Sequence, residues 1–436
     1  MQTASKKIIN AWAMYDWANS TYNLVITTTF FPIYFTAVTK HAFGSEKVPL
    51  LGRSFVNSSL YDYTLSVAYF IIALSYPVLT SIADTRGNKK KFMRFFCYMG
   101  AIGCSALYFF HGDNIWLGII AFMMAASGYV GSLVFYNAFL PEIAAPQDQD
   151  RISARGFSFG YIGSVIMQLI GFGLVLLLAN DPNYLGPRIT FLLVGLWWAG
   201  FAQITFARLP ETKRNNVAGG NVFRNGFDAV KKVYNQVKTM PVLKRYLRAF
   251  FFYSMGVQTV MLAATIFGSK LLQLEDTKLI ITVVIIQLVA IPGAILMSRL
   301  SNVFGNIKVL MGVIFFWILI CIAAYYTADY KIKGGNPEYF FYGLSVAVGL
   351  VMGGIQSLSR STYSKLMPET KDTASFFSYY DLTEKIAIVI GMFAFGYIEE
   401  LTGSMQNSVL SLIVFFVIGL IWLYSALVKQ KQAVSG

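Results

Sequence analysis

The sequence contains few charged residues. Only 13% of its 436 residues are Asp, Glu, Lys or Arg, whereas soluble domains carry about 25%. Hydrophobic residues make up 56% of the chain, and the mean hydropathy is +0.57. A chain with so little charge cannot cover its surface with groups that bind water. These values exclude an ordinary soluble domain and indicate a protein surrounded largely by lipid.

Residues that support enzyme and metal chemistry are also scarce. The two histidines, His41 and His111, lie at predicted outer ends of apolar runs, which excludes a histidine-rich metal site. No Gly-Lys-Ser/Thr phosphate-binding loop is present, which argues against ATP-driven transport. The three cysteines, Cys97, Cys104 and Cys321, fall inside apolar runs, where they behave as small apolar side chains. We therefore expect neither enzyme activity nor a cofactor.

The chain has twelve long apolar runs instead. A membrane-spanning helix needs about 20 mostly apolar residues, and the runs lack the alternation over about 10 residues that barrel strands show. The runs cover residues 9–38, 61–83, 92–110, 114–140, 156–179, 188–208, 246–272, 278–300, 307–327, 338–366, 375–400 and 406–428. The sequence thus predicts an all-α membrane protein with twelve transmembrane helices.

The longest polar interval divides these runs into six and six. We expect an N-terminal six-helix bundle over 1–209, a linker over 210–245, and a C-terminal six-helix bundle over 246–436. Within the linker, apolar residues at helical spacing predict an amphipathic helix on the inner membrane surface, and a partly ordered basic linker is the alternative. These apolar residues are Phe223, Phe227, Val230, Tyr234 and Val237.

The net charge of +14 comes from unevenly placed basic residues. Of 35 Lys and Arg, 26 fall at the two ends of the chain and in the loops on the same side, and only 8 fall in the opposite loops. Arg360, Lys365 and Lys371 belong to the larger set, whereas Lys385 lies inside a run. By the positive-inside rule, both termini are cytoplasmic, with a bacterial inner membrane favoured. The basic excess is a topology signal and does not indicate nucleic-acid binding.

Two sequence echoes relate the halves. The segment "FYNAFLPE" (135–142) at the end of the fourth run resembles "STYSKLMPE" (361–369) at the end of the tenth. The segment "TSIADTRGNKK" (80–90) after the second run resembles "SRLSNVFGNIK" (298–308) after the eighth. Both pairs are offset by six helices, which predicts two parallel repeats with a cavity between them, as in secondary transporters.

The segment "ADTRGNKK" resembles the loop signature of the major facilitator superfamily, Gly-x-x-x-Asp-Arg-x-Gly-Arg-Lys. Asp84, Gly87 and the basic run 89–91 match it, whereas Thr80, Thr85 and Asn88 depart from it.

Three longer stretches narrow the resemblance, at 15–35, 135–163 and 349–391. They are similar to the unknown major facilitator branch, which is related to the autophagy-related vacuolar amino-acid effluxers of fungi. The resemblance implies the major facilitator fold, alternating access, and a cavity lined by runs one, four, seven and ten. On that basis Asn137, Gln258 and Gln356 rank first among the intramembrane amides, since amides suit a polar substrate. Each one is as well explained by helix packing.

Asp16, in "AMYDWANSTYN", lies in a run that otherwise suits lipid. A carboxylate at a membrane centre costs roughly 2.5–3.5 kcal/mol on insertion scales. At about 100° per residue, Asp16, Asn19, Asn23 and Thr27 share one stripe. We expect this stripe to face protein or water, as a substrate or proton site. A packing network of asparagines is the alternative.

The eleventh run carries three more charges, Asp381, Glu384 and Lys385. Asp381 and Lys385 are four residues apart and are expected to pair on one face, with Glu384 pointing about 100° away. Lys385 paired with Asp16 is the alternative. Either pairing leaves one carboxylate for a proton relay, although a purely structural or gating charge cluster explains the residues as well.

Asp84 ends the second run, and the resemblance places it beside the start of the eleventh run. A helix N-terminus carries about half a positive charge, so we expect Asp84 to dock near residues 373–375 when the cytoplasmic side is closed. Gly87 allows the tight turn, and Glu142 and Arg155 are expected to extend this gate.

The sequence therefore predicts a monomeric secondary transporter of a small polar solute, with an amino acid or peptide-like substrate favoured and proton coupling left open. A lipid or amphiphile exporter, or a non-transporting scaffold or receptor, remains the alternative.

Overall fold

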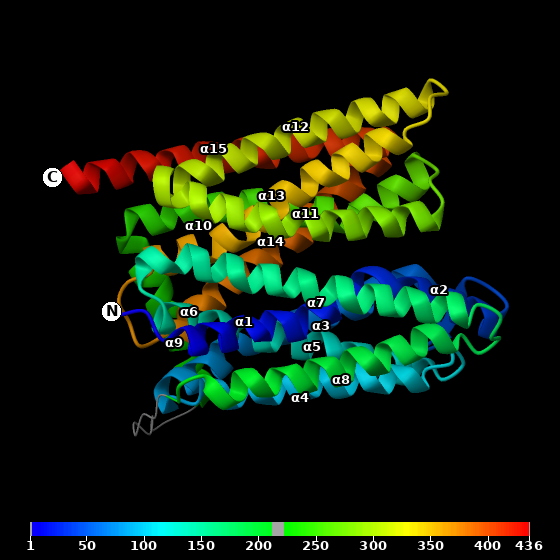
Figure 1. The fold of residues 1–436 in the computed structure, drawn as a ribbon, viewed down its shortest axis with the longest axis horizontal. Coiled ribbons are helices and arrows are strands. Elements are labelled where there is room, and N and C mark those ends of the chain that lie inside the picture. The colour runs from blue at the N-terminus through cyan, green and yellow to red at the C-terminus, as the bar shows by residue number, and fades with distance from the viewer. Residues whose placement is uncertain (1, 212–221, 436) are drawn as a thin grey trace.

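The computed structural model describes residues 2–211 and 222–435. Its helices run side by side in two bundles, with α1–α8 below and α10–α15 above in Figure 1. Both chain ends lie at the same end of the helices (Figure 1). We call this end the terminal face and the other end the far face.

The first bundle contains eight α-helices, two short 3-10 turns, one π-helical segment and a small hairpin at the far face. The elements are α1 (Lys6–Thr21), η1 (Tyr22–Phe30), α2 (Phe31–Phe43), β1 (Lys47–Leu50), β2 (Arg53–Val56), α3 (Asn57–Arg86), α4 (Lys89–Ala106), η2 (Leu107–Phe109), α5 (Ile115–Ala138), α6 (Leu140–Ile143), η3 (Pro146–Asp148), α7 (Gln149–Leu177) and α8 (Leu185–Arg208). The antiparallel hairpin pairs Lys47 with Val56, and its strands are not among the predicted elements.

The second bundle follows a linker helix. The elements are α9 (Val222–Thr239), α10 (Pro241–Ile266), η4 (Phe267–Leu271), α11 (Asp276–Phe304), α12 (Asn306–Ile332), α13 (Glu338–Leu366), α14 (Thr373–Thr402) and α15 (Met405–Ser435). Every predicted apolar run is thus helical.

Within the described residues, ten helices are long and apolar enough to cross a membrane. The two predicted spans outside this set are the first run, built from α1, η1 and α2, and the eleventh, α14. These two contain Asp16 and the trio Asp381, Glu384 and Lys385. The two predicted spans outside the set are therefore the ones that carry the intramembrane charges singled out from the sequence.

The bundles meet along α3 with α14 and along α7 with α11 and α13. Within each bundle, glycines allow the closest approaches between helices. A Cβ on Gly353 would collide with the carbonyl oxygen of Ala290 on α11, and one on Gly163 would lie 2.8 Å from the carbonyl oxygen of Trp17 on α1.

The first run is not a uniform α-helix, contrary to the assumption behind the predicted polar stripe. Its middle, η1, is π-helical, and such segments are wider than an α-helix and frequent at functional sites. The Leu24 carbonyl accepts hydrogen bonds from the hydroxyls of Thr28 and Thr29 and from Gln168 of α7. Because η1 begins at Tyr22, Asn23 and Thr27 lie beyond the regular geometry that placed them in line with Asp16.

The linker helix α9 packs against α3, α14 and α10. Val233 and Val237 are buried, and Gly226 lies against the backbone of Val78 on α3. Tyr234, predicted for the apolar face, is exposed, with Lys238 over its ring. The apolar side of α9 therefore contacts protein where the sequence predicted membrane. Phe223 and Phe227 lie outside the residues whose side chains are described.

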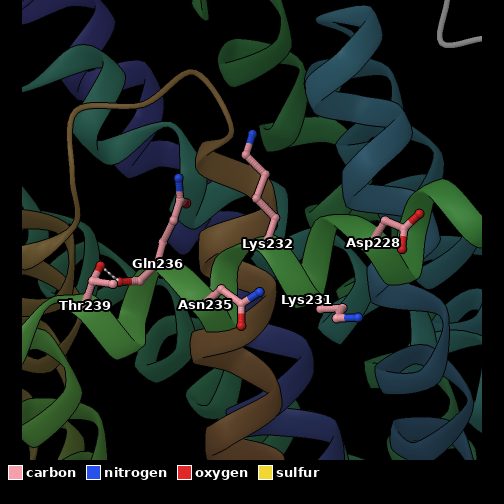
Figure 2. Close-up of a pocket in the computed structure, with 6 residues that line it drawn as sticks. All are labelled: Asp228, Lys231, Lys232, Asn235, Gln236 and Thr239. Atoms are coloured by element: carbon pink, nitrogen blue, oxygen red, sulfur yellow. Dashed lines mark hydrogen bonds between the residues drawn. The ribbon is translucent and has the colours of Figure 1, made fainter.

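The opposite side of α9 is polar and open. Figure 2 shows the side chains that line a pocket of about 490 Å³ along it: Asp228, Lys231, Lys232, Asn235, Gln236 and Thr239. Lys232 pairs at 2.9 Å with Asp372, which directly precedes α14. The linker helix is thereby fastened to both bundles at the terminal face.

Candidate functional site

Asp16 is paired with an arginine from the other bundle. Both terminal nitrogens of Arg360, on α13, donate to Asp16 Oδ2 at 3.3 Å, and the Tyr136 hydroxyl donates to the same oxygen at 2.7 Å. Asp16 is 4% exposed and Arg360 is 3% exposed. Asp16 therefore faces protein, as the cost of placing it in lipid requires.

Arg360 is fixed in place by the first bundle. Its Nε donates to Ser153 Oγ at 2.9 Å, its Nη2 to the Ser153 carbonyl at 2.9 Å, and its Nη1 to Asn137 Oδ1 at 3.4 Å. The guanidinium carbon also lies 4.8 Å from the ring centre of Trp12 and 4.3 Å from that of Phe157. Hydrogen bonds and cation–π contacts together compensate a desolvated guanidinium.

Gly156, on α7, leaves the space for this ion pair. A Cβ at this position would collide with Asp16 Oδ2 and would lie 3.0 Å from Arg360 Nη2. The absence of a side chain at Gly156 thus makes room for the charged site.

The partner of Asp16 is a correction to the sequence analysis. Arg360 was counted there with the loop charges, but it lies inside α13, six residues before Leu366 and so roughly 9 Å from the helix end. Lys385, the predicted alternative partner, pairs with Glu384 at 3.2 Å. The signal that could have found Arg360 is its place inside the apolar run 338–366.

A second polar cluster lies deeper along α14. Glu384 is eleven residues beyond Thr373, roughly 16 Å along the helix. It accepts from Gln258 Nε2 of α10 at 3.1 Å, and Lys385 Nζ lies 5.4 Å from the ring centre of Tyr69 on α3. The Glu384 and Lys385 side chains are 17% and 16% exposed. Groups from both bundles thus surround a partly accessible ion pair.

The predicted Asp381–Lys385 pair is absent from the structure. Helix spacing separates Glu384 and Lys385 by about 100°, but both side chains are long enough to close that angle. Asp381 is 5% exposed, and its Oδ2 has no hydrogen-bond partner among the described residues. Its neighbours are Asn137, Arg360 and the Glu384–Lys385 pair.

The remaining predicted site residues do not join these clusters. Asn19 is fully buried, and neither of its amide atoms has a partner within the part of the chain that is described. Asn23 is half-buried. Gln356 Nε2 points to Met261 Sδ at 3.6 Å, a contact between α13 and α10.

Asp84 lies on the N-terminus of α14, where the sequence analysis expected it. Its carboxylate accepts from the backbone N–H groups of Ala374 and Ser375 at 3.2 and 2.8 Å and from the Ser375 hydroxyl at 2.8 Å. The positive end of the helix dipole adds to this binding. Gly87 follows at φ 64°, a left-handed conformation that closes the helix turn.

Lys89 and Glu142 extend this contact. Lys89 is buried, forms an ion pair with Glu142, and lies 3.6 Å from Asp84. The Thr373 hydroxyl donates to Glu142 at 2.7 Å. Lys89 is thus more than a solvated topology signal. Arg155, which was expected to join, has its guanidinium 5.6 Å from the Phe159 ring and no hydrogen bond or ion pair among the described residues.

A related cluster occupies the equivalent place in the other repeat. Asp150, in the first turn of α7, accepts from Ser301 Oγ, Asn306 Nδ2 and Lys365 Nζ at 2.7, 2.7 and 2.6 Å. Ser301 and Asn306 belong to the second copy of the sequence echo that contains Asp84. We call the Asp84 and Asp150 clusters the two latches. Asp150 was not predicted, because the echo marked its partners and not the acid.

The described hydrogen bonds and ion pairs between the bundles lie at the terminal face or at mid-depth. The one farthest from the terminal face joins Gln287 Nε2 of α11 to Gln168 Oε1 of α7 at 3.0 Å. Within residues 2–211 and 222–435, none joins the far-face ends of the two bundles. The terminal face is therefore the closed side of this structure.

Solved transporter structures have the same fold. The human organic anion transporter MFSD10 (TETRAN) matches with a TM-score of 0.73 at 13% identity, covering 96% of this chain and 99% of that one. The Escherichia coli fucose:proton symporter FucP matches at 0.67 and 14%, covering 96% and 97%. At these identities the likeness establishes the major facilitator fold and confirms the predicted fold class.

Sequence relatives cover nearly the whole chain. An uncharacterized MFS-type transporter of Bacillus subtilis, YxiO, is 31% identical over 94% of this chain and 93% of its own. Autophagy-related protein 22 of Kluyveromyces lactis is 22% identical over 95% and 92%. A sequence model of the family described as "Vacuole effluxer Atg22 like" matches residues 4–434. The chain thus belongs to the Atg22-like effluxer family and is a multi-pass membrane transporter of the major facilitator type.

Proposed function

We propose that the protein is a secondary active transporter that moves a small polar solute by alternating access, with an amino acid or peptide-like solute favoured. The observation that carries the proposal is the Glu384–Lys385 pair with Gln258, a partly exposed charged site between the bundles. Buried ion pairs often stabilise a fold no better than apolar packing would. Their retention at the boundary between two repeats therefore favours a role in transport.

The chemistry of this site suits a zwitterion. Glu384 can bind an ammonium group, Lys385 a carboxylate, and Gln258 has both donors and an acceptor. Tyr69 offers an aromatic face beside Lys385. A lipid exporter needs an apolar, laterally open cavity, so the charges at mid-depth favour the polar solute.

The two repeats act as the moving bodies in this proposal, with residues 1–209 and 246–436 as bundles and 210–245 as linker. The distribution of basic residues supports a cytoplasmic terminal face, and so cytoplasmic termini. The Bacillus relative supports a bacterial plasma membrane. The structure then represents a state closed to the cytoplasm, in which the Asp16–Arg360 pair and the two latches form the gate.

Asp381 is the proposed proton carrier. Asp16 is paired with Arg360 and Glu384 with Lys385, whereas one buried carboxylate oxygen of Asp381 has no partner among residues 2–211 and 222–435. It lies on α14 between the gate and the mid-depth site, so a proton there can influence both.

The direct test is uptake of an amino-acid and peptide panel into proteoliposomes. Glu384→Gln removes one charge-assisted contact, and such contacts are worth about 1.5–3 kcal/mol. We expect apparent affinity for the transported solute to fall roughly ten- to hundredfold. Glu400→Gln, an exposed position on the same helix, is the matched control. Wild-type protein that moves no solute, or equal transport by both variants, contradicts the proposal.

Proton coupling is tested in the same vesicles with an imposed pH gradient. Wild-type uptake should accelerate with the gradient. Asp381→Asn, which keeps the shape of the side chain but cannot carry the proton, should transport at one rate with or without it. Gradient-driven accumulation that persists in Asp381→Asn would remove Asp381 from this role and leave the solute site intact.

The Asp16–Arg360 pair is tested by a double-mutant cycle. Asp16→Asn or Arg360→Gln alone leaves one buried charge unpaired, which costs about 3–5 kcal/mol. The double variant Asp16→Asn/Arg360→Gln leaves none, and its thermal unfolding in detergent should return most of the way to wild type. If the losses of thermal stability in the two single variants add up in the double variant, the two charges do not stabilise each other.

The latches are tested by distance measurements between spin labels on Lys91→Cys and Lys371→Cys. These exposed sites lie at the terminal face on opposite bundles, and the three native cysteines are buried. Asp84→Asn/Asp150→Asn should shift the distance distribution toward longer values. Asp148→Asn, which removes an acid bonded only within the first bundle, should leave it unchanged. The same distribution in both variants would contradict a gating role.

A further inference from the structure

The outer surface of the second bundle carries an apolar groove between α11, α12 and α13. Its cavity volume is about 460 Å³. Met297, Leu300 and Phe304 of α11 line one wall, and Phe316 of α12 lines the other. Among the ten apolar spans, α11 and α12 contain the two most hydrophobic stretches. This groove therefore lies at a surface that faces bilayer hydrocarbon.

Gly312 keeps the middle of the groove open. A Cβ at this position would meet no atom within 4 Å. A larger side chain on Gly312 would therefore occupy the groove without colliding with the neighbouring helices. Leu350 of α13 also lines the groove.

A single cation lies at the terminal-face end of the groove. Lys308 is the one charged residue that lines it. It is exposed and has no ion pair among the described residues. From Lys308 to Phe316 the helix rises roughly 12 Å, so the charge stands at one end of an elongated apolar slot.

We propose that this groove binds one anionic phospholipid. An acyl chain lies along Met297, Leu300 and Gly312, and the headgroup phosphate pairs with Lys308. The groove has apolar walls and one lining cation, Lys308, at its membrane-surface end. A phospholipid matches it, because it has apolar acyl chains and an anionic headgroup at one end. Basic residues beside pockets between transmembrane helices are known to recognise such headgroups. The proposed lipid site does not depend on which solute is transported or on whether transport is coupled to protons.

The groove lies behind one latch. Leu300 directly precedes Ser301, Lys308 follows Asn306 by two residues, and both Ser301 and Asn306 donate to Asp150. A lipid bound across α11 and α12 therefore stabilises the turn between these helices, which carries the two donors. The lipid site is placed to stabilise the state in which the terminal face is closed.

The test is native mass spectrometry of the delipidated full-length protein titrated with phosphatidylglycerol or with phosphatidylcholine of the same acyl chains. Wild-type protein should bind a first phosphatidylglycerol in preference to phosphatidylcholine. Lys308→Gln should lower that first binding about fivefold, the effect of one basic residue near a membrane surface. Gly312→Leu should lower the binding of both lipids by filling the groove.

Matched controls separate this site from the general lipid shell. Lys91→Gln removes an exposed lysine at the start of α4, and Gly200→Leu fills open space beside α8. Both should bind lipid as wild type does. Equal binding of the two lipids by wild type, losses in the controls as large as in the groove variants, or a protein dimer that Gly312→Leu abolishes would overturn the proposal. Thermal unfolding of each variant without added lipid checks that the fold is retained.

Discussion

A charged group buried among membrane helices must be paired within the protein, because lipid offers it no partner. In this structure the partner repeatedly comes from the other bundle. Asp16 is neutralised by Arg360, Asp84 by the N-terminus of α14, and Asp150 by Lys365. Stabilising the charges and holding the bundles together are thus one interaction. A motion that separates the bundles at the terminal face must break these pairs, so the conformational change carries an electrostatic cost that a bound solute or proton can offset.

The three acids are satisfied by different chemistry. Asp16 shares a guanidinium that aromatic rings also cover, Asp84 uses backbone N–H groups, and Asp150 uses an ammonium and two neutral donors. Asp381 differs from all three, since one of its oxygens is buried without a partner among the described residues. Asp16, Asp84 and Asp150 are therefore carboxylates whose negative charge is compensated by their neighbours, and Asp381 is one whose charge is compensated only in part. That contrast, rather than the mere presence of acids, supports the different roles proposed for them.

Sequence reasoning found what local patterns encode. The apolar runs predicted the helices, and the resemblance to the major facilitator superfamily placed Asp84 beside the start of the eleventh run, where its contact lies. It failed where side chains from distant segments meet. Arg360 looked like a loop residue because it is near the end of a run, although Asp16 requires just such a partner. Lys385 was assigned by helix spacing alone, which neglects the reach of its side chain toward Glu384. The π-helical segment η1 left no composition signal, so the polar stripe was drawn on the wrong geometry beyond Tyr22.

The repeat also explains why the two latches resemble each other without being copies. In the first, the acid, Asp84, lies within the loop echo in the last turn of α3, and it binds the start of α14. In the second, the echo supplies Ser301 and Asn306 as donors, and the acid, Asp150, stands in the first turn of α7. The equivalent helix ends thus meet in both latches, but the carboxylate lies on the opposite member of the pair in each. What the repeat preserves is the meeting of these helix ends. An exchange of donor and acceptor across it keeps the contact, so a search for conserved acids in both halves would miss one latch.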